Sequence, residues 1–232
     1  MGVKSMAVLA AVLVGVAPSA TFASTTPPDA DDNTHVYTLG DVAIPPGEPG
    51  VISIVLVGPP TDLGQLPVVV RNNTAEAVGS VEVNVIARDS AGGLVATGSD
   101  SGFWPAPLQP GQWAFGLLTF DAYRLAGGEQ FEFTTASRGV EYALGNAYTV
   151  VEAAIQPGTG GETRVIGILQ NDSDETSGMG RLLIACFEGP LLTGIIDTFP
   201  DSIGPGSTGG FTATAEGVPC FCRSHRGQLH LR

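Results

Sequence analysis

The chain has 232 residues, including 32 Gly and 17 Pro, and a formal net charge of −13. Gly and Pro make up about a fifth of it, below the roughly 25–30% typical of low-complexity disordered chains. Apolar residues, at 43%, are sufficient for a core. The composition therefore excludes a wholly disordered chain. The acidity argues against nucleic-acid binding, because phosphates are bound by basic surfaces.

Residues 1–23 are typical of a secretory signal peptide. Lys4 supplies the positive charge, Ala7–Ala17 is an apolar run, and Thr21-Phe22-Ala23 ends in small residues suited to cleavage after Ala23. The apolar run is too short for a membrane anchor, which needs about 20 residues. We expect a secreted, extracellular protein with no membrane span, in which residues 24–35 form a polar linker.

Cleavage would remove the only lysine, Lys4. The mature chain would carry 23 acidic residues against nine arginines, a net charge of −14. Without Lys, Schiff-base chemistry, Ser-Lys catalysis and Lys–Asn isopeptide cross-links are excluded for the mature chain.

Four short segments occur twice in the same order, which predicts an internal repeat. The matched pairs are 36–41 with 141–146, 43–50 with 154–161, 70–74 with 169–173, and 108–111 with 203–206. We therefore predict two units, residues 36–137 and 138–219, followed by a tail at residues 220–232.

Each unit has the pattern of short β-strands. Val81, Val83, Val85 and Ala87 alternate with polar residues, as in a strand with one solvated face. Turn-forming residues follow at short intervals, and they include 72–74, 89–93, 110–111, 171–173 and 205–206. The predicted fold class is all-β, with two tandem immunoglobulin-like antiparallel β-sandwiches.

The order of these segments resembles the FxLYD-type immunoglobulin-like domain of secreted bacterial proteins. The resemblance covers Val68–Phe120 and, more weakly, Val165–Ala215. Of the family's Phe-x-Leu-Tyr-Asp motif, the first unit keeps only Asp89, and the second has Glu188 at that place. The resemblance implies an extracellular accessory or binding module without enzymatic activity.

The three cysteines allow two interpretations. Cys186 matches Ala87 in the repeat and would then be a buried, inert thiol. Alternatively it forms a disulfide with Cys220 or Cys222, as export to an oxidising space permits. Either way one cysteine has no partner within the chain, and we expect a free or intermolecular thiol.

The tail holds four candidate metal ligands: Cys220, Cys222, His225 and His230. Thiolates and imidazoles bind Zn²⁺ or copper, but this spacing matches no common zinc pattern. We therefore expect a disordered tail and no cofactor. The acidic turn Asp172–Glu175 offers oxygen ligands for Ca²⁺, yet it lacks the EF-hand loop pattern, and we expect a solvated turn.

Phe103, Trp104 and Trp113 are the candidate binding surface. Aromatic side chains beside Pro105 and Pro107 can form a platform for a ligand or protein. The alternative, which we favour, is that they fill the core or cover its edge.

These observations predict a secreted, non-catalytic binding or structural module of the bacterial cell exterior. His35 is the only histidine outside the tail, and it lies in the polar stretch before the first predicted strand. The sequence therefore lacks the packed histidine that a Ser-His-Asp triad needs. We expect the partner to be another extracellular or cell-envelope protein or polymer.

The alternative is a small secreted metal-binding protein or hydrolase that uses the tail or surface carboxylates. Stoichiometric metal by elemental analysis, lost on truncation after Pro219, would favour the metal-binding alternative.

Overall fold

The computed structural model describes residues 34–38, 44–121, 125, 127–140, 148–157, 162–176, 181–188 and 190–215. Every regular element in this part of the chain is a β-strand, and no helix is present there. This confirms the predicted all-β class. The predicted signal peptide, most of the linker and the tail at residues 220–232 lie outside the described residues.

The first half of the structure, residues 52–139, is a six-stranded antiparallel sheet. Its strand order is β2-β3-β6-β5-β4-β7. The strands are β2 (Ile52–Val57), β3 (Gln65–Asn72), β4 (Val78–Arg88), β5 (Leu94–Trp104), β6 (Trp113–Phe120) and β7 (Gln130–Gly139).

This sheet folds over itself at β5. Residues 94–99 pair with β4, residues 98–104 pair with β6, and the register shifts between Asp100 and Phe103. At the shift, the Asp100 carboxylate accepts hydrogen bonds from the Val83 amide (2.5 Å) and the Gly102 amide (2.8 Å). Where β5 leaves β4, the Asp100 carboxylate thus accepts the bond from the Val83 amide that a backbone carbonyl of β5 would otherwise accept. Such a replacement is needed because a strand irregularity interrupts the backbone ladder. The two parts of the sheet then enclose one apolar core.

The second half comprises two three-stranded sheets with the orders β12-β9-β8 and β1-β10-β11. Side chains from both sheets enclose a second apolar core, so this half is also sandwich-like. The strands are β1 (Thr34–Thr38), β8 (Tyr148–Pro157), β9 (Thr163–Asn171), β10 (Arg181–Glu188), β11 (Leu191–Thr198) and β12 (Thr208–Ala215).

The N-terminal strand differs from the sequence prediction. Residue 36 was expected to begin the first unit, but β1 pairs in parallel with β10 of the second half, from Thr34 opposite Arg181 to Thr38 opposite Ala185. At the other boundary, β7 ends at Gly139, two residues beyond the predicted end of the first unit. The physical reason is that pairing between distant strands leaves no local signal in the sequence.

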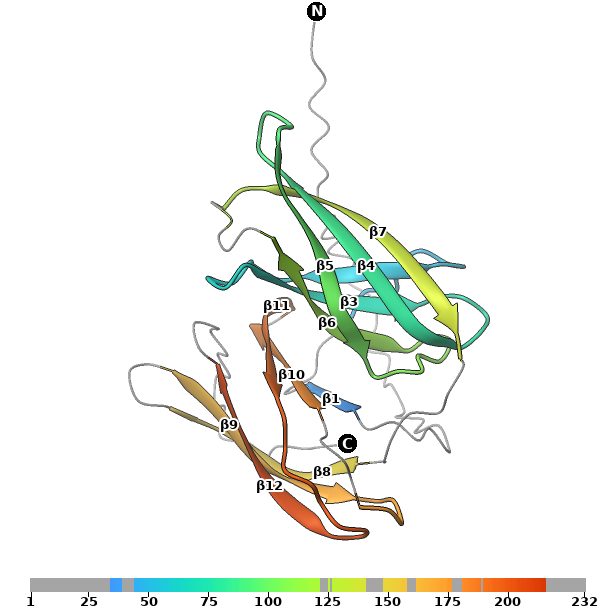
Figure 1. The fold of residues 1–232 in the computed structure, drawn as a ribbon, viewed down its shortest axis with the longest axis vertical. Coiled ribbons are helices and arrows are strands. Elements are labelled where there is room, and N and C mark those ends of the chain that lie inside the picture. The colour runs from blue at the N-terminus through green and yellow to red at the C-terminus, as the bar shows by residue number, and fades with distance from the viewer. Residues whose placement is uncertain are drawn as a thin grey trace, which may run out of the picture.

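The two halves stack as four layers (Figure 1). β4, β5 and β7 form one outer layer, β2, β3 and β6 the next, β1, β10 and β11 the third, and β8, β9 and β12 the other outer layer. A third apolar cluster lies between the two inner layers. It contains Val69, Phe115, Leu117, Leu183, Ala185, Phe187, Leu192 and Ile195.

The position of a strand in the stack explains its apolar pattern. β4 belongs to an outer layer, and its buried side chains alternate with partly or fully exposed ones, as predicted for residues 81–88. The inner strand β3 is buried almost throughout, because Val68 and Val70 face one core while Val69 faces the inner cluster. β10 has the same character, from Leu182 to Phe187. A strand covered on both faces needs apolar residues at consecutive positions.

The predicted hairpin at residues 89–93 is confirmed. The Asp89 carboxylate accepts hydrogen bonds from the amides of Ala91 (2.9 Å) and Gly93 (2.7 Å). The Asp89 amide bonds to the Gly93 carbonyl at 2.9 Å, and Gly92 has a φ of 85° that favours glycine. The predicted Pro-Gly turns at 110–111 and 205–206 are also present, with positive φ at Gly111 and Gly206.

A buried asparagine, Asn72, closes the end of β3. Its side chain is fully buried, and its amide nitrogen donates to the carbonyls of Glu76 (2.8 Å) and Leu108 (2.9 Å). Its side-chain oxygen accepts from the Thr74 amide (3.0 Å) and the Thr74 hydroxyl (2.7 Å). Asn72 thus ties the β3–β4 connection to the β5–β6 connection.

Asn171, at the end of β9, makes the matching set of bonds in the second half. It is also fully buried, and its amide donates to the carbonyls of Glu175 (2.7 Å) and Ile203 (2.9 Å). Its oxygen accepts from the Ser173 amide (3.1 Å) and hydroxyl (2.7 Å). Thr74 and Leu108, and correspondingly Ser173 and Ile203, lie in the matched segments 70–74 with 169–173 and 108–111 with 203–206, while Glu76 and Glu175 lie two residues beyond them.

Replacement of either asparagine should strongly destabilise the protein. Asn72→Ala removes one donor from each of the Glu76 and Leu108 carbonyls and the acceptor of two bonds from Thr74. We expect the free energy of unfolding to fall by about 2–4 kcal/mol. Asn171→Ala should behave alike. Urea denaturation followed by circular dichroism measures both losses.

The matched control is Asn84→Ala, on the exposed face of β4, which should change the free energy of unfolding by no more than about 0.5 kcal/mol. Equal effects of Asn72→Ala and Asn84→Ala would contradict the structural role of the buried amide.

Candidate functional site

The three residues of the predicted aromatic surface lie at different depths. Phe103 is buried, with 4% of its surface exposed, and belongs to the core of the first half. Its ring covers Gly116 of β6, where an added Cβ would lie 2.8 Å from the ring. Phe103 is therefore not a surface residue: its candidate role in a binding surface is corrected, and the favoured interpretation that it fills the core holds. The cause is the register of β5, which turns Phe103 toward the core.

Trp104 lies at the junction of the two halves. The Arg181 guanidinium, at the start of β10, stacks on the Trp104 ring with Cζ 3.8 Å from a ring centroid. The ring also approaches Gly102 so closely that an added Cβ there would lie 2.3 Å from it. Trp104 is half-buried and packs against the inner cluster. A guanidinium over an indole face is a favourable cation–π contact.

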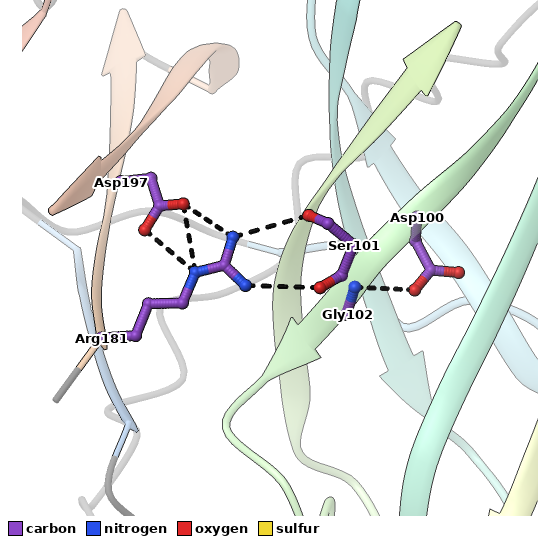
Figure 2. A network of polar contacts seen from close by, with 5 residues as sticks. All are labelled: Asp100, Ser101, Gly102, Arg181 and Asp197. Atoms are coloured by element: carbon purple, nitrogen blue, oxygen red, sulfur yellow. Dashed lines mark hydrogen bonds and ion pairs between the residues drawn. The ribbon is translucent and has the colours of Figure 1, made fainter. Parts of the chain in front are cut away.

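Arg181 also forms the main ion pair of this junction (Figure 2). Its Nη2 donates to Asp197 Oδ2 at 2.6 Å, and its Nε donates to both carboxylate oxygens at 3.0 and 3.1 Å. Nη1 donates to the Ser101 carbonyl of β5 at 3.3 Å. The Arg181 and Asp197 side chains are only 19% and 25% exposed. Arg181 therefore connects β11 of the second half to β5 of the first. We call Trp104, Arg181, Asp197 and Ser101 the junction cluster.

Trp113, at the start of β6, packs on the same side of the molecule. Its ring meets Phe115 edge-to-face, with centroids 5.1 Å apart at 85°. It is half-buried and contacts the inner cluster. The interpretation that both tryptophans cover the edge of a core thus fits their packing better than a free aromatic platform does.

No local sequence pattern indicates the junction cluster. The contacts of Arg181 with Asp197 and Trp104 depend on how the two halves pack. The weak signal that could have been used is Gly102, since a glycine two residues from a tryptophan leaves room for the ring.

The predicted acidic turn is occupied by structural bonds. The Ser173 hydroxyl and the Glu175 carbonyl belong to the Asn171 network, and the Asp172 carboxylate accepts a 2.6 Å bond from the Thr149 hydroxyl. Among the described residues, no group of three or more His, Cys, Asp or Glu could hold a metal ion. The candidate metal ligands of the tail, Cys220, Cys222, His225 and His230, lie outside the described residues.

Cys186 is buried in the core of the second half, as the match with Ala87 predicted. It is disulfide-bonded, so the interpretation of Cys186 as an inert thiol is wrong. The other two cysteines of the chain, Cys220 and Cys222, lie outside the described residues. Which of them pairs with Cys186 stays a prediction.

The outer layers present exposed strand faces. On the layer of β4, β5 and β7, the exposed side chains of Asn84, Ser99 and Thr134 lie at one register level, because Asn84 is opposite both of the others. Nearby, Arg88 pairs with Glu132 at 3.0 Å, and Arg138 pairs with Glu82. No described helix is long and apolar enough to cross a membrane.

Comparison with protein-family models and with curated proteins finds no match to this chain. The resemblance to FxLYD-type domains therefore stays a prediction from the residues quoted for it.

The junction cluster should contribute to stability. Arg181→Ala leaves Asp197 partly buried without its partner and removes the contact with Trp104. We expect the free energy of unfolding to fall by about 2–4 kcal/mol. The matched control, Arg88→Ala, breaks a more exposed pair and should cost no more than about 0.5 kcal/mol.

Tryptophan fluorescence should report the same junction. In a Trp113→Phe protein, Trp104 alone emits, and we expect a blue-shifted emission that acrylamide quenches weakly. Adding Arg181→Ala should shift the emission to longer wavelength and increase quenching. Emission near the water-exposed limit with Arg181 intact would contradict the packing described for Trp104.

Proposed function

We propose that this protein is a secreted, non-catalytic binding or structural module of the bacterial cell exterior, built from two tandem immunoglobulin-like sandwiches. The observation that carries the proposal is the joining of two sandwich-like halves through an apolar inner cluster and the junction cluster. Such packing holds two sets of outer sheet faces in a fixed relation. That suits a protein whose task is to present surfaces rather than to enclose a substrate.

The outer face of β4, β5 and β7 is the contact surface that we favour. Asn84, Ser99 and Thr134 are exposed there and offer both donors and acceptors. The aromatic side chains near the junction are less suited to contact a partner, since Arg181 stacks on Trp104 and Trp113 packs on Phe115. The partner would be another protein or a polymer of the cell envelope.

The charge of the chain restricts the class of partner. The mature protein would carry 23 acidic residues against nine arginines, and its field would repel polyanions. A neutral or basic envelope component is therefore the partner class that the proposal names, and salt should slow the association with a basic one.

Co-sedimentation with purified cell-wall polymer and with envelope protein fractions tests this function. We expect saturable binding that Asn84→Arg or Thr134→Arg weakens by about tenfold, because a long charged side chain disrupts a flat contact. The matched control is Thr212→Arg, on the exposed face of β12 in the opposite outer layer, which should bind like the unchanged chain.

Loss of binding in Thr212→Arg alone would move the contact surface to the other outer layer and contradict our choice of face. Absence of binding to every envelope fraction, together with turnover on a panel of substrates, would overturn the proposed function itself.

A further inference from the structure

The edge of β10 is occupied by a strand from the far end of the chain. β1, with five residues, lies along β10 in parallel, from Thr34 opposite Arg181 to Thr38 opposite Ala185. On its other side, β10 pairs with β11 in the antiparallel direction. β1 is the outermost strand of its sheet. The second half thus takes a strand that precedes the whole first half in the sequence.

The corresponding edge in the first half is filled differently. β4 and β10 each follow a buried asparagine, and each pairs with the strand that comes next, β5 or β11. On its free side, β4 pairs with β7, which has ten residues, runs antiparallel and comes next after β6 in the chain. β1 and β7 therefore occupy equivalent edge positions beside β10 and β4. β7 follows the other strands of its sheet in the chain, whereas β1 is separated from β10 and β11 by the whole first half.

We propose that the β10 edge is an acceptor for an extended strand, and that its occupant between molecules is residues 34–38 of a second copy of this chain. Every copy carries the same strand and the same acceptor, so exchange preserves all five register pairs. Exchange of an identical element costs little, because it creates the contacts that it breaks.

The chemistry of the two strands favours this occupant. Residues 34–38 (THVYT) carry no Asp, Glu, Lys or Arg, and neither do residues 182–187 of β10. In a chain with a net charge of −13, these neutral segments can pair without the repulsion that protects a charged edge. β10 is also buried on both faces from Leu182 to Phe187, so an unoccupied edge would expose backbone groups within an apolar environment.

The connection between β1 and β2 determines which copy β1 reaches. Residues 39–51 separate the two strands. The later part of this connection is fixed to the first half, since the Glu48 amide bonds to Ser53 and the Gly50 amide to Asn73. Ile44 also packs against the inner cluster, so residues 39–43 are the part of the connection left to reach the acceptor in the same chain. Removal of residues 39–43 shortens this reach by about 17 Å in an extended chain.

Deletion of residues 39–43 in the full chain therefore tests the proposal. We expect the deleted chain to form dimers or larger closed assemblies, with the monomer fraction in light scattering reduced by about tenfold. Replacement of the same five residues by Gly-Ser-Gly-Ser-Gly, which keeps the length, should leave the oligomeric state unchanged. Adding Val36→Pro to the deletion should restore the monomer, because proline removes an amide and disrupts the ladder.

A second measurement covers the case in which the deleted chain does not fold. The full-length chain in ¹⁴N and ¹⁵N forms, refolded together at high concentration, should give mixed dimers in native mass spectrometry, and Val36→Pro should remove them. A folded deletion variant that stays monomeric, or dimers that Val36→Pro leaves unchanged in either experiment, would overturn the proposal. Absence of mixed dimers together with an unfolded deletion variant would overturn it as well. The inference does not rest on the proposed function, and no outcome here depends on envelope binding.

Discussion

The fold depends on the buried side-chain amide of Asn72, which donates hydrogen bonds to backbone carbonyls as a main-chain amide would. At the end of β3 the chain must leave one sheet layer and enter the next, and this leaves carbonyl groups of two connections facing the interior. The Asn72 amide donates a hydrogen bond to one carbonyl of each connection, at Glu76 and Leu108. The adjacent Val78 and Leu108 then exchange backbone bonds of 3.1 and 2.8 Å, which fixes where β4 begins. In the second half, the Asn171 amide donates in the same way to the carbonyls of Glu175 and Ile203. Buried polar groups of this kind specify a structure because no other arrangement satisfies them.

Sequence patterns predicted the outer layers better than the inner ones. Alternation at residues 81–87 identified β4 and its solvated face, and the turn residues 72–74 and 89–93 were found by their Asx chemistry. These signals are local, since each acts within a few residues. Continuous apolar runs such as Val68–Val70 and Leu182–Phe187 also appear in the sequence, and their physical meaning is a strand buried on both faces. These apolar runs indicate that each strand is covered on both faces, as in two stacked sandwiches, but they do not indicate which strands contact each other.

The junction between the halves and the place of β1 could not be read from the sequence. The favoured interpretation of Trp104, at the edge of a core, agrees with its packing, but its contact with Arg181 comes from another sheet and had no signal in the sequence. Likewise Val36-Tyr37-Thr38 resembled residues 141–143 and was assigned to the first unit, whereas its backbone pairs with β10. Both features depend on contacts between residues far apart in the chain. Such contacts depend on the packing of the whole structure and produce no periodic pattern in the sequence.

The buried asparagines have a consequence for the choice of expression host. Asn72-Asn73-Thr74 and Asn171-Asp172-Ser173 both have the Asn-x-Ser/Thr form recognised as an N-glycosylation acceptor. A glycan on the amide nitrogen would leave it a single hydrogen, while the fold needs two, and the sugar could not enter a site with no exposed surface. The tripeptide that closes each turn thus makes folding incompatible with glycan transfer to these side chains. Expression hosts that attach N-glycans to this sequence pattern are therefore poorly matched to production of this chain.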